Sequence, residues 1–239
     1  RRKILEFAWE ARDFDLAFDP SGNAKLAFKS GDGLHFLECG KDCESVPETW
    51  IVFQLGWGGR HAMALQGSKV RLVFYDGTAT DSLQTSDSLL YAWCDGLCNQ
   101  PGNWGAAPIG APKGAGSSGV GLALGPTGQP TVAFAHDTKH LSVSRCSSAC
   151  EREGASWSSA LLETSDDLDR EIDLTELHPL ACGGEPSGGA GYYWFPGERP
   201  RLASNGKALV HGATTLYQCS RFGEVREGIH LVRYLDIGD

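Results

Sequence analysis

The amino-acid sequence predicts an all-β fold, and three observations lead to this prediction. The chain of 239 residues contains 31 glycines and 11 prolines, which favour tight turns between short strands. A pattern of strand, glycine-containing turn and strand recurs about every 50 residues, and each copy is followed by an apolar segment that ends in cysteine. In three copies a tryptophan then opens a further strand. Four consecutive antiparallel strands per repeat are the unit of a β-propeller blade. We therefore expect one domain, residues 1–239, with four recognisable four-stranded blades, although five blades or a part of a longer array also fit the pattern.

The hairpins that open the repeats align on their glycine turns. They cover residues 15–28, 62–74, 121–134 and, more weakly, 201–210. The third strands are expected to end at cysteine, in segments 34–39, 89–94, 141–146 and 216–219. The fourth strands begin at Trp50, Trp104 and Trp157. Their fixed repeat position predicts that these tryptophans pack between blades, since burial stabilises large apolar side chains.

Two segments depart from the repeat. Residues 158–198 form an insertion that is too long for an ordinary blade connection. Residues 3–9 have the pattern of a strand that precedes the first repeat. This strand either closes the ring against the last blade or belongs to a longer array.

Six of the eight cysteines form three pairs with identical spacing: Cys39 with Cys43, Cys94 with Cys98, and Cys146 with Cys150. Close cysteine pairs are also zinc half-sites, but two half-sites must converge to complete a tetrahedron, and equivalent positions in successive repeats do not usually converge. We therefore expect three local disulfides. The simplest pairing for the remaining two cysteines joins Cys182 in the insertion to Cys219. Disulfides indicate an exported protein, which is secreted, periplasmic or held at the cell surface.

The third repeat carries a resemblance to a known family. Leu122, Ala123, Gly128 and Pro130 are followed by the Cys146 and Cys150 pair and by Trp157. This pattern resembles the bacterial sialidase-like (BNR-type) β-propeller repeats, in the subset that has a Cys-x-x-x-Cys hairpin in each blade. The resemblance covers most of residues 13–158 and, more weakly, 199–236. It implies the fold, whereas blade motifs of this kind do not specify an activity.

The charge balance excludes several classes of partner. The chain has 21 Lys and Arg against 30 Asp and Glu, a formal net charge of -9, with no basic cluster, so we expect no nucleic-acid binding. No apolar run approaches the roughly 18 residues of a membrane helix, so we expect no membrane insertion. A signal-peptide pattern is absent from the N-terminus of this sequence or has already been removed.

The candidate ligand-binding residues lie where one blade passes to the next. An aromatic residue precedes an arginine there three times: Trp9 with Arg12, Trp57 with Arg60, and Trp194 with Arg199. Aromatic faces stack on sugar rings, and arginine forks bind carboxylates. Sialidases use an arginine triad on the carboxylate of their sugar, and this arrangement is loosely similar. The alternative is that each arginine pairs locally with a carboxylate such as Glu10 or Asp13.

Other chemistry has weaker support. Tyr192, Tyr193 and Glu185 in the insertion have the residue types of a sialidase nucleophile and its partners, but no motif supports them. His136 and His140 lie in a turn between strands, where no helix aligns them as metal ligands. The acidic run Asp166, Asp167, Asp169 lacks the spacing of an EF-hand and is expected to be a solvated loop. We expect no cofactor and no bound metal.

The sequence therefore favours a secreted binding module for a glycan or an extracellular protein. A sialidase-like glycoside hydrolase or lyase is the first alternative, and a structural spacer within a larger surface protein is the second. The sequence does not identify the ligand or the oligomeric state.

Overall fold

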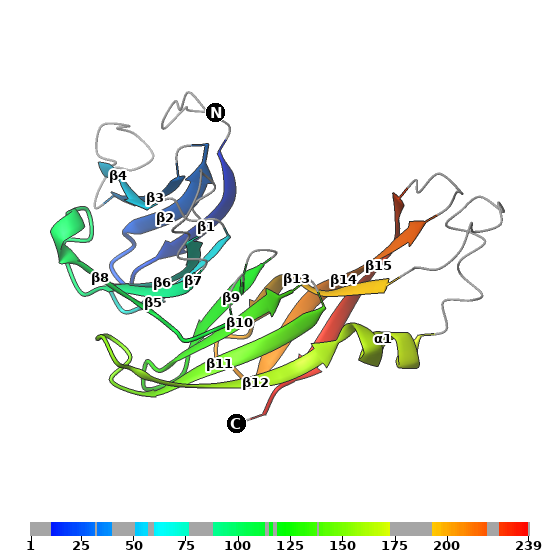
Figure 1. The fold of residues 1–239 in the computed structure, drawn as a ribbon. Coiled ribbons are helices and arrows are strands. Elements are labelled where there is room, and N and C mark those ends of the chain that lie inside the picture. The colour runs from blue at the N-terminus through cyan, green and yellow to red at the C-terminus, as the bar shows by residue number, and fades with distance from the viewer. Residues whose placement is uncertain are drawn as a thin grey trace, which may run out of the picture.

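The computed structural model describes residues 11–31, 33–39, 51–56, 60–76, 88–112, 115–116, 119–137, 139–172, 193–218 and 225–238. These residues form four antiparallel sheets in which successive strands are neighbours, and the sheets follow one another along the chain (Figure 1). The predicted all-β, β-propeller architecture with four blades is confirmed. Within this part of the chain, no helix is long and apolar enough to cross a membrane.

The first two sheets have four strands each. The first contains β1 (Arg12–Phe18), β2 (Ala24–Ser30), β3 (Gly33–Cys39) and β4 (Ile51–Gly56). The second contains β5 (His61–Gln66), β6 (Lys69–Asp76), β7 (Ser88–Cys94) and β8 (Trp104–Pro108), with a short 3-10 turn at Pro101–Asn103. The turn between β1 and β2 contains Gly22 at a φ of 82°, in the left-handed region that favours glycine. The glycine turns that aligned the repeats therefore mark hairpins.

The other two sheets complete the chain. The third contains β9 (Val120–Leu124), β10 (Pro130–His136), β11 (His140–Ser148) and β12 (Ser156–Thr164). Helix α1 (Ser165–Glu171) follows, and the fourth sheet contains β13 (Tyr193–Leu202), β14 (Ala208–Gln218) and β15 (Val225–Asp236). Within the described residues this last sheet has three strands.

The fourth sheet corrects two predictions. Segment 216–219 was expected to form a separate third strand, but β14 runs without interruption to Gln218, and β15 takes the place of the third strand. The expected insertion, 158–198, is also narrower in the structure, because β12 continues to Thr164 and β13 begins at Tyr193. The predicted insertion was bounded by Trp157 and Arg199. In the structure β12 pairs with β11 as far as Thr164, and β13 pairs with β14 from Tyr193 onward.

Helix α1 begins in the acidic run that the sequence predicted as a solvated loop. Thr164 accepts a hydrogen bond from the backbone of Asp167, and the Asp167 side chain accepts one in return from the backbone of Thr164. This reciprocal capping box satisfies backbone groups that the first turn leaves without helical partners. The prediction of a solvated loop was wrong here, because the carboxylate of Asp167 caps the N-terminus of the helix.

Tryptophans at the repeat position pack against the preceding blade, as predicted. The ring of Trp104 lies 5.1 Å from that of Phe36 in the first sheet, edge to face. The ring of Trp157 lies 5.6 Å from that of Tyr91 in the second sheet in the same manner. Trp50 lies outside the described residues. The main core cluster lies between the second and third sheets and contains Val73, Tyr91 and Phe134.

The first strands of successive sheets are neighbours, since β5 contacts β1, β9 contacts β5, and β13 contacts β9. One face of β1 is not covered by a preceding sheet within the described residues. Leu16 is 58% exposed, whereas Leu122, at the same place in the third repeat, is 9% exposed and joins the core. The predicted strand 3–9 lies outside the described residues.

Two of the four predicted disulfides are present in the described part of the chain. Cys94 is bonded to Cys98 and Cys146 to Cys150, with Cα separations of 5.7 and 5.9 Å. Cys39 is also disulfide-bonded, whereas Cys43, Cys182 and Cys219 lie outside the described residues.

Replacing both Cys94 and Cys98 by alanine is expected to cost about 2 kcal/mol, because the bridge closes a short loop in the unfolded chain. For a domain of this size the thermal midpoint should fall by roughly 4–8 °C. Scanning calorimetry would check this, with the exposed Ser148→Ala as the control. An unchanged midpoint in the double variant would show that the bridge does not stabilise the second sheet.

Candidate functional site

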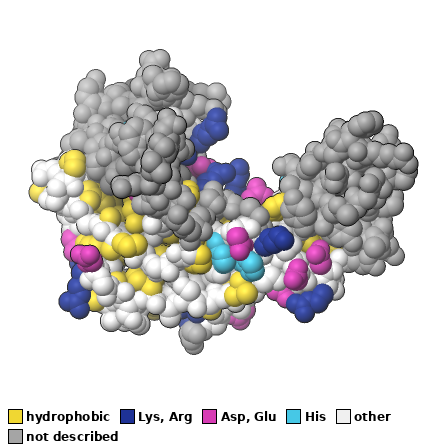
Figure 2. All heavy atoms as spheres, in the orientation of Figure 1, with side chains coloured by type: hydrophobic (Ala, Val, Ile, Leu, Met, Phe, Trp, Pro, Cys, Tyr) yellow, Lys and Arg dark blue, Asp and Glu magenta, His cyan; other side chains and the backbone are white. Residues whose placement is uncertain are grey.

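The first strands of the four sheets surround a cavity of about 510 Å³. It is lined by Arg12, Asp13, Asp15, Arg60, His61, Gly119, Val120, Arg199 and Arg201. The structure thus brings Arg12, Arg60 and Arg199 to one cavity from three different sheets. Arg12 begins β1, Arg60 directly precedes β5, and Arg199 lies at the bulge in the second half of β13; these three strands belong to neighbouring sheets. Figure 2 shows basic side chains beside an acidic one in the upper part of the face that it presents.

Backbone irregularities direct side chains toward this cavity. Asp13 and Arg199 have φ angles of 51° and 46°, in the left-handed region that side chains other than glycine rarely adopt. The strand register shifts at both places, between Arg12 and Asp15 in β1 and between Glu198 and Arg201 in β13. Bulges of this kind bend a strand and re-aim its side chains, and strained backbone is concentrated at functional sites.

Glycine allows β13 to approach the third sheet closely. A Cβ atom on Gly119 would lie 2.8 Å from the backbone nitrogen of Arg199, and one on Gly121 would lie 2.6 Å from the carbonyl oxygen of Pro200. Real Cβ atoms essentially never make contacts this short, so a larger residue at either position would push β13 away. The two glycines therefore bring Arg199 to the wall of the cavity.

Two carboxylates hold part of the arginine cluster in place. Nη1 of Arg60 donates to both carboxylate oxygens of Asp13, at 2.8 and 2.7 Å. Nη1 of Arg201 lies 3.3 Å from Asp15, which joins β13 to β1 across the cavity. Asp15 also accepts a hydrogen bond from the backbone of Met63 in β5. The sequence left open that each arginine pairs with a nearby carboxylate. Arg60 does so, although its partner Asp13 belongs to the neighbouring sheet.

Arg199 differs from these paired arginines. Its side chain is exposed and makes no hydrogen bond or ion pair with the described part of the chain. Among the described residues, four guanidinium groups and two carboxylates line the cavity. It is therefore cationic in a protein whose net charge is -9.

His61 is the buried titratable group of the cavity. The residue is 5% exposed, neither ring nitrogen has a hydrogen-bond partner within the part of the chain that the structure describes, and Nε2 lies 3.9 Å from Asp15. Burial lowers the pKa of His61 below its ordinary value, because the imidazolium is costly away from water. The carboxylates of Asp15 and Asp13 and the backbone of Ala27 act in the opposite direction, while Arg201 adds to the lowering. His61 is therefore held in the neutral form near neutral pH.

This shift predicts a pH-dependent contribution to stability. Because the pKa of His61 is lower in the folded state than the roughly 6.5 of the unfolded chain, the unfolded state binds more protons as the pH falls. The stabilisation is complete above about pH 6.5 and is lost as the pH falls through the folded-state pKa. Urea unfolding of the wild type and of His61→Gln at pH 7.5 and pH 5 would measure it. The free energy of unfolding of His61→Gln should rise relative to that of the wild type when the pH is lowered from 7.5 to 5. An identical difference in this free energy at both pH values would contradict the lowered pKa of His61.

The three predicted tryptophans do not form an aromatic wall in the described structure. Trp194 is 0% exposed and packs against Leu168 of α1 and Ala213 of β14, so its prediction as a ligand-binding residue is corrected. Its side chain is covered because helix α1 lies against β13. Trp9 and Trp57 lie outside the described residues.

Sequence reasoning named Asp13 only as a local partner of an arginine, and it did not identify Asp15 or His61. A usable signal existed, because Asp13 follows Arg12 and His61 follows Arg60 directly. Residues adjacent to the predicted arginines at the start of a first strand reach the same cavity.

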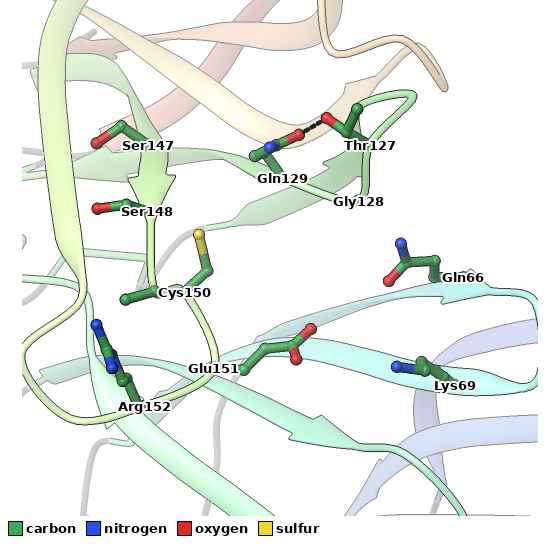
Figure 3. A pocket seen from close by; sticks show the side chains of 11 residues that line it. Gln66, Lys69, Thr127, Gly128, Gln129, Ser147, Ser148, Cys150, Glu151 and Arg152 are labelled. Atoms are coloured by element: carbon green, nitrogen blue, oxygen red, sulfur yellow. Dashed lines mark hydrogen bonds between the residues drawn. The ribbon is translucent and has the colours of Figure 1, made fainter.

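A second cavity of about 600 Å³ lies between the second and third sheets at the hairpin turns (Figure 3). Its lining includes Gln66, Lys69, Gln129, Ser147 and Glu151. Glu151 is ion-paired with the buried Arg71, so its charge is already compensated. Besides its amide and hydroxyl groups this cavity has Lys69 and one guanidinium group, that of Arg152, whereas four guanidinium groups line the first.

Comparison with known proteins gives a likeness at the level of the fold. No family model and no curated protein matches the chain. One similar solved structure is an engineered GH43 glycoside hydrolase with endo-xylanase and exo-arabinofuranosidase activity, with 9% identity, a TM-score of 0.46, and coverage of 95% of this chain and 40% of the other. Another is an α-L-arabinofuranosidase from Podospora anserina in complex with cellotriose, with 11% identity, a TM-score of 0.44, and coverage of 90% and 66%.

A third is an exo-β-1,3-galactanase from Clostridium thermocellum, with 12% identity, a TM-score of 0.31, and coverage of 65% and 32%. The chain spans less than two thirds of the length of each of these proteins. At these identities and TM-scores, an activity has to be argued from the residues of the cavity.

Proposed function

We propose that the protein is an exported binding module whose cationic cavity holds an acidic group of a glycan. The observation that carries this proposal is the convergence of Arg12, Arg60, Arg199 and Arg201 on one cavity. Asp13 and Asp15 pair with Arg60 and Arg201, whereas Arg199 makes no ion pair within the described residues. A ligand carboxylate supplies a negatively charged partner for Arg199.

The size and chemistry of the cavity support a sugar acid. Ligand sites commonly have volumes of about 300–1,000 Å³, and this cavity has about 510 Å³. Arginine binds planar carboxylates through paired hydrogen bonds, and each charge-assisted bond contributes roughly 1.5–3 kcal/mol. Arg199 has the exposed guanidinium that such a bond requires.

The carboxylates of the cavity favour binding over hydrolysis. Glycoside hydrolases commonly need two carboxyl groups, one of which donates a proton. Asp13 is ion-paired with Arg60 and Asp15 with Arg201, so both carboxylates are already engaged by the cavity wall. We therefore place the hydrolase or lyase second, and a purely structural spacer third, since a spacer does not require the arginine cluster.

Export is part of the same proposal. Two disulfides lie in the described part of the chain, and such bonds persist in oxidising compartments. The protein should accordingly be studied in its oxidised form.

The test compares acidic and neutral sugars. Isothermal titration of the intact oxidised protein with a galacturonic acid trisaccharide and with a galactose trisaccharide should show a clear preference for the acid. Arg199→Gln should weaken binding of the acidic sugar about tenfold or more, because a charge-assisted hydrogen bond is lost. Arg170→Gln is the matched control, since Arg170 is exposed on α1 away from the cavity and should leave affinity unchanged. Equal affinity for both sugars, or an undiminished affinity in Arg199→Gln, would refute the proposal.

A further inference from the structure

The turn between β10 and β11 gathers three side chains that ligate metals. His136 ends β10, His140 begins β11, and the two residues are direct partners in the strand register. Their rings stack with centroids 5.0 Å apart and an interplanar angle of 15°. Asp137 lies between them in the sequence and has a φ of 46°, which turns the chain sharply after His136. The side chains of His136, Asp137 and His140 are thereby brought to the same side of the turn.

The ligand atoms of the three side chains point toward one another. One ligand atom from each of His136, Asp137 and His140 can be chosen so that all lie within 4.8 Å of one another. Nδ1 of His140 lies 2.5 Å from Oδ1 of Asp137, and Nδ1 of His136 lies 3.7 Å from Oδ2 of the same carboxylate. The carboxylate therefore faces both imidazoles.

A buried hydroxyl group orients one of the imidazoles. Nε2 of His136 lies 3.2 Å from Oγ of Ser142, and Ser142 is 6% exposed. When Nε2–H donates to this hydroxyl, the lone pair is on Nδ1, the nitrogen that faces Asp137. Metal-bound histidines usually have such a hydrogen bond on the other ring nitrogen, which fixes the tautomer and the orientation of the ring.

We propose that His136, Asp137 and His140 form a surface site for a single Zn²⁺ ion. Two imidazole nitrogens and a carboxylate oxygen are a ligand set that zinc accepts, at about 2.0–2.2 Å, and the tetrahedral geometry leaves one position for water. Tetrahedral ligands at that distance are roughly 3.4 Å apart, so the close contact between Asp137 and His140 has to open slightly when the ion binds between them. The two bound imidazoles are neutral, and zinc binding releases protons to the solvent.

The zinc site lies at the same end of the third sheet as the arginine cavity. Val120, which begins β9, pairs with Phe134 near the end of β10. The backbone nitrogen of Ala135 donates to the carbonyl oxygen of Gly119, a residue of the cavity wall. Figure 2 shows imidazole groups on the surface beside an acidic side chain. The side chains of Asp137 and His140 are 56% and 34% exposed, so the open coordination position is accessible to solvent.

Calorimetric titration with zinc chloride tests the proposal. The intact oxidised protein is first dialysed against a chelator and then against chelator-free buffer without reductant, because free thiols also bind zinc. The wild type should bind one equivalent. His140→Gln and Asp137→Asn should each weaken binding at least about tenfold, the loss expected for one ligand of a small site. His230→Gln, which removes a histidine from the fourth sheet, should retain wild-type affinity.

The controls separate loss of the site from loss of the fold. The thermal midpoints of His140→Gln and Asp137→Asn should agree with that of the wild type, because these side chains are at least partly exposed at the turn between β10 and β11. A crystal soaked with zinc should show an anomalous peak between the two imidazoles. Absence of saturable binding in the wild type, or equal binding in His140→Gln and His230→Gln, would overturn the proposal. A peak at another location would do the same.

Discussion

Replacing Glu163 by alanine is expected to lower the free energy of unfolding by about 3–5 kcal/mol, the usual cost of breaking a buried ion pair by removing one partner. Glu163 lies on β12 and is 3% exposed. Nε and Nη2 of Arg233 donate to its Oε1 at 3.1 and 2.9 Å, and Nε2 of the buried His211 lies 3.0 Å from its Oε2. These partners belong to β15 and β14, so one carboxylate joins the third sheet to the fourth.

The measurement is thermal unfolding of Glu163→Ala, Glu163→Gln and a control. The alanine variant should lose roughly 6–20 °C in the thermal midpoint, and the glutamine variant should lose less because it keeps the shape of the side chain. Glu171→Gln is the control: Glu171 also binds Arg233 but is 57% exposed, and exposed ion pairs contribute at most about 1 kcal/mol. Equal destabilisation by the Glu163 and Glu171 substitutions would show that burial of the pair is not the cause.

Replacing Arg71 by alanine is expected to cost about 3 kcal/mol. The Arg71 side chain is completely buried on β6 and contacts Asp95 of the second sheet and Glu151 of the third. Its Nη1 also donates to the carbonyl oxygens of Val70 and Cys94, at 2.9 and 3.3 Å. The substitution removes these bonds and the packing of the side-chain stem. The expected cost is below the upper end for buried pairs, because both carboxylates are partly exposed and regain water.

Urea unfolding with a matched control would check the Arg71 prediction. Lys69→Gln removes an exposed partner of the same Asp95 carboxylate, at 3.6 Å, and should cost less than about 1 kcal/mol. An effect of Arg71→Ala no larger than that of Lys69→Gln would contradict the view that Arg71 fastens the second sheet to the third.

Repeat position predicted much of this architecture, because it reports local hairpins directly. Gly22 and Gly128 mark turns, and Trp104 and Trp157 pack at the same place in successive blades. The repeat alignment also predicted that Arg12, Arg60 and Arg199 approach one another, although β13 begins at Tyr193 and reaches the cavity through its bulge at Arg199, not through its first residues.

The burial of particular side chains and the short helix could not be predicted in this way. They depend on contacts between segments that are far apart in the sequence, and the repeat pattern carries no information on such contacts. Trp194 has the local pattern of a site residue, yet α1 covers it, and α1 itself forms through a capping box between Thr164 and Asp167. Arg71 and Glu163 have charges typical of surface positions, and only their partners from neighbouring sheets make burial tolerable. The pairing of His136 with His140 depends on the strand register.

The most direct test of the central claim is a crystal structure of the oxidised protein with a bound uronic acid oligosaccharide. A ligand carboxylate is expected within about 2.7–3.2 Å of the guanidinium of Arg199 or Arg60. A ligand bound instead between Gln66 and Gln129 in the second cavity (Figure 3), or a cationic cavity that remains without ligand at saturating concentration, would contradict it.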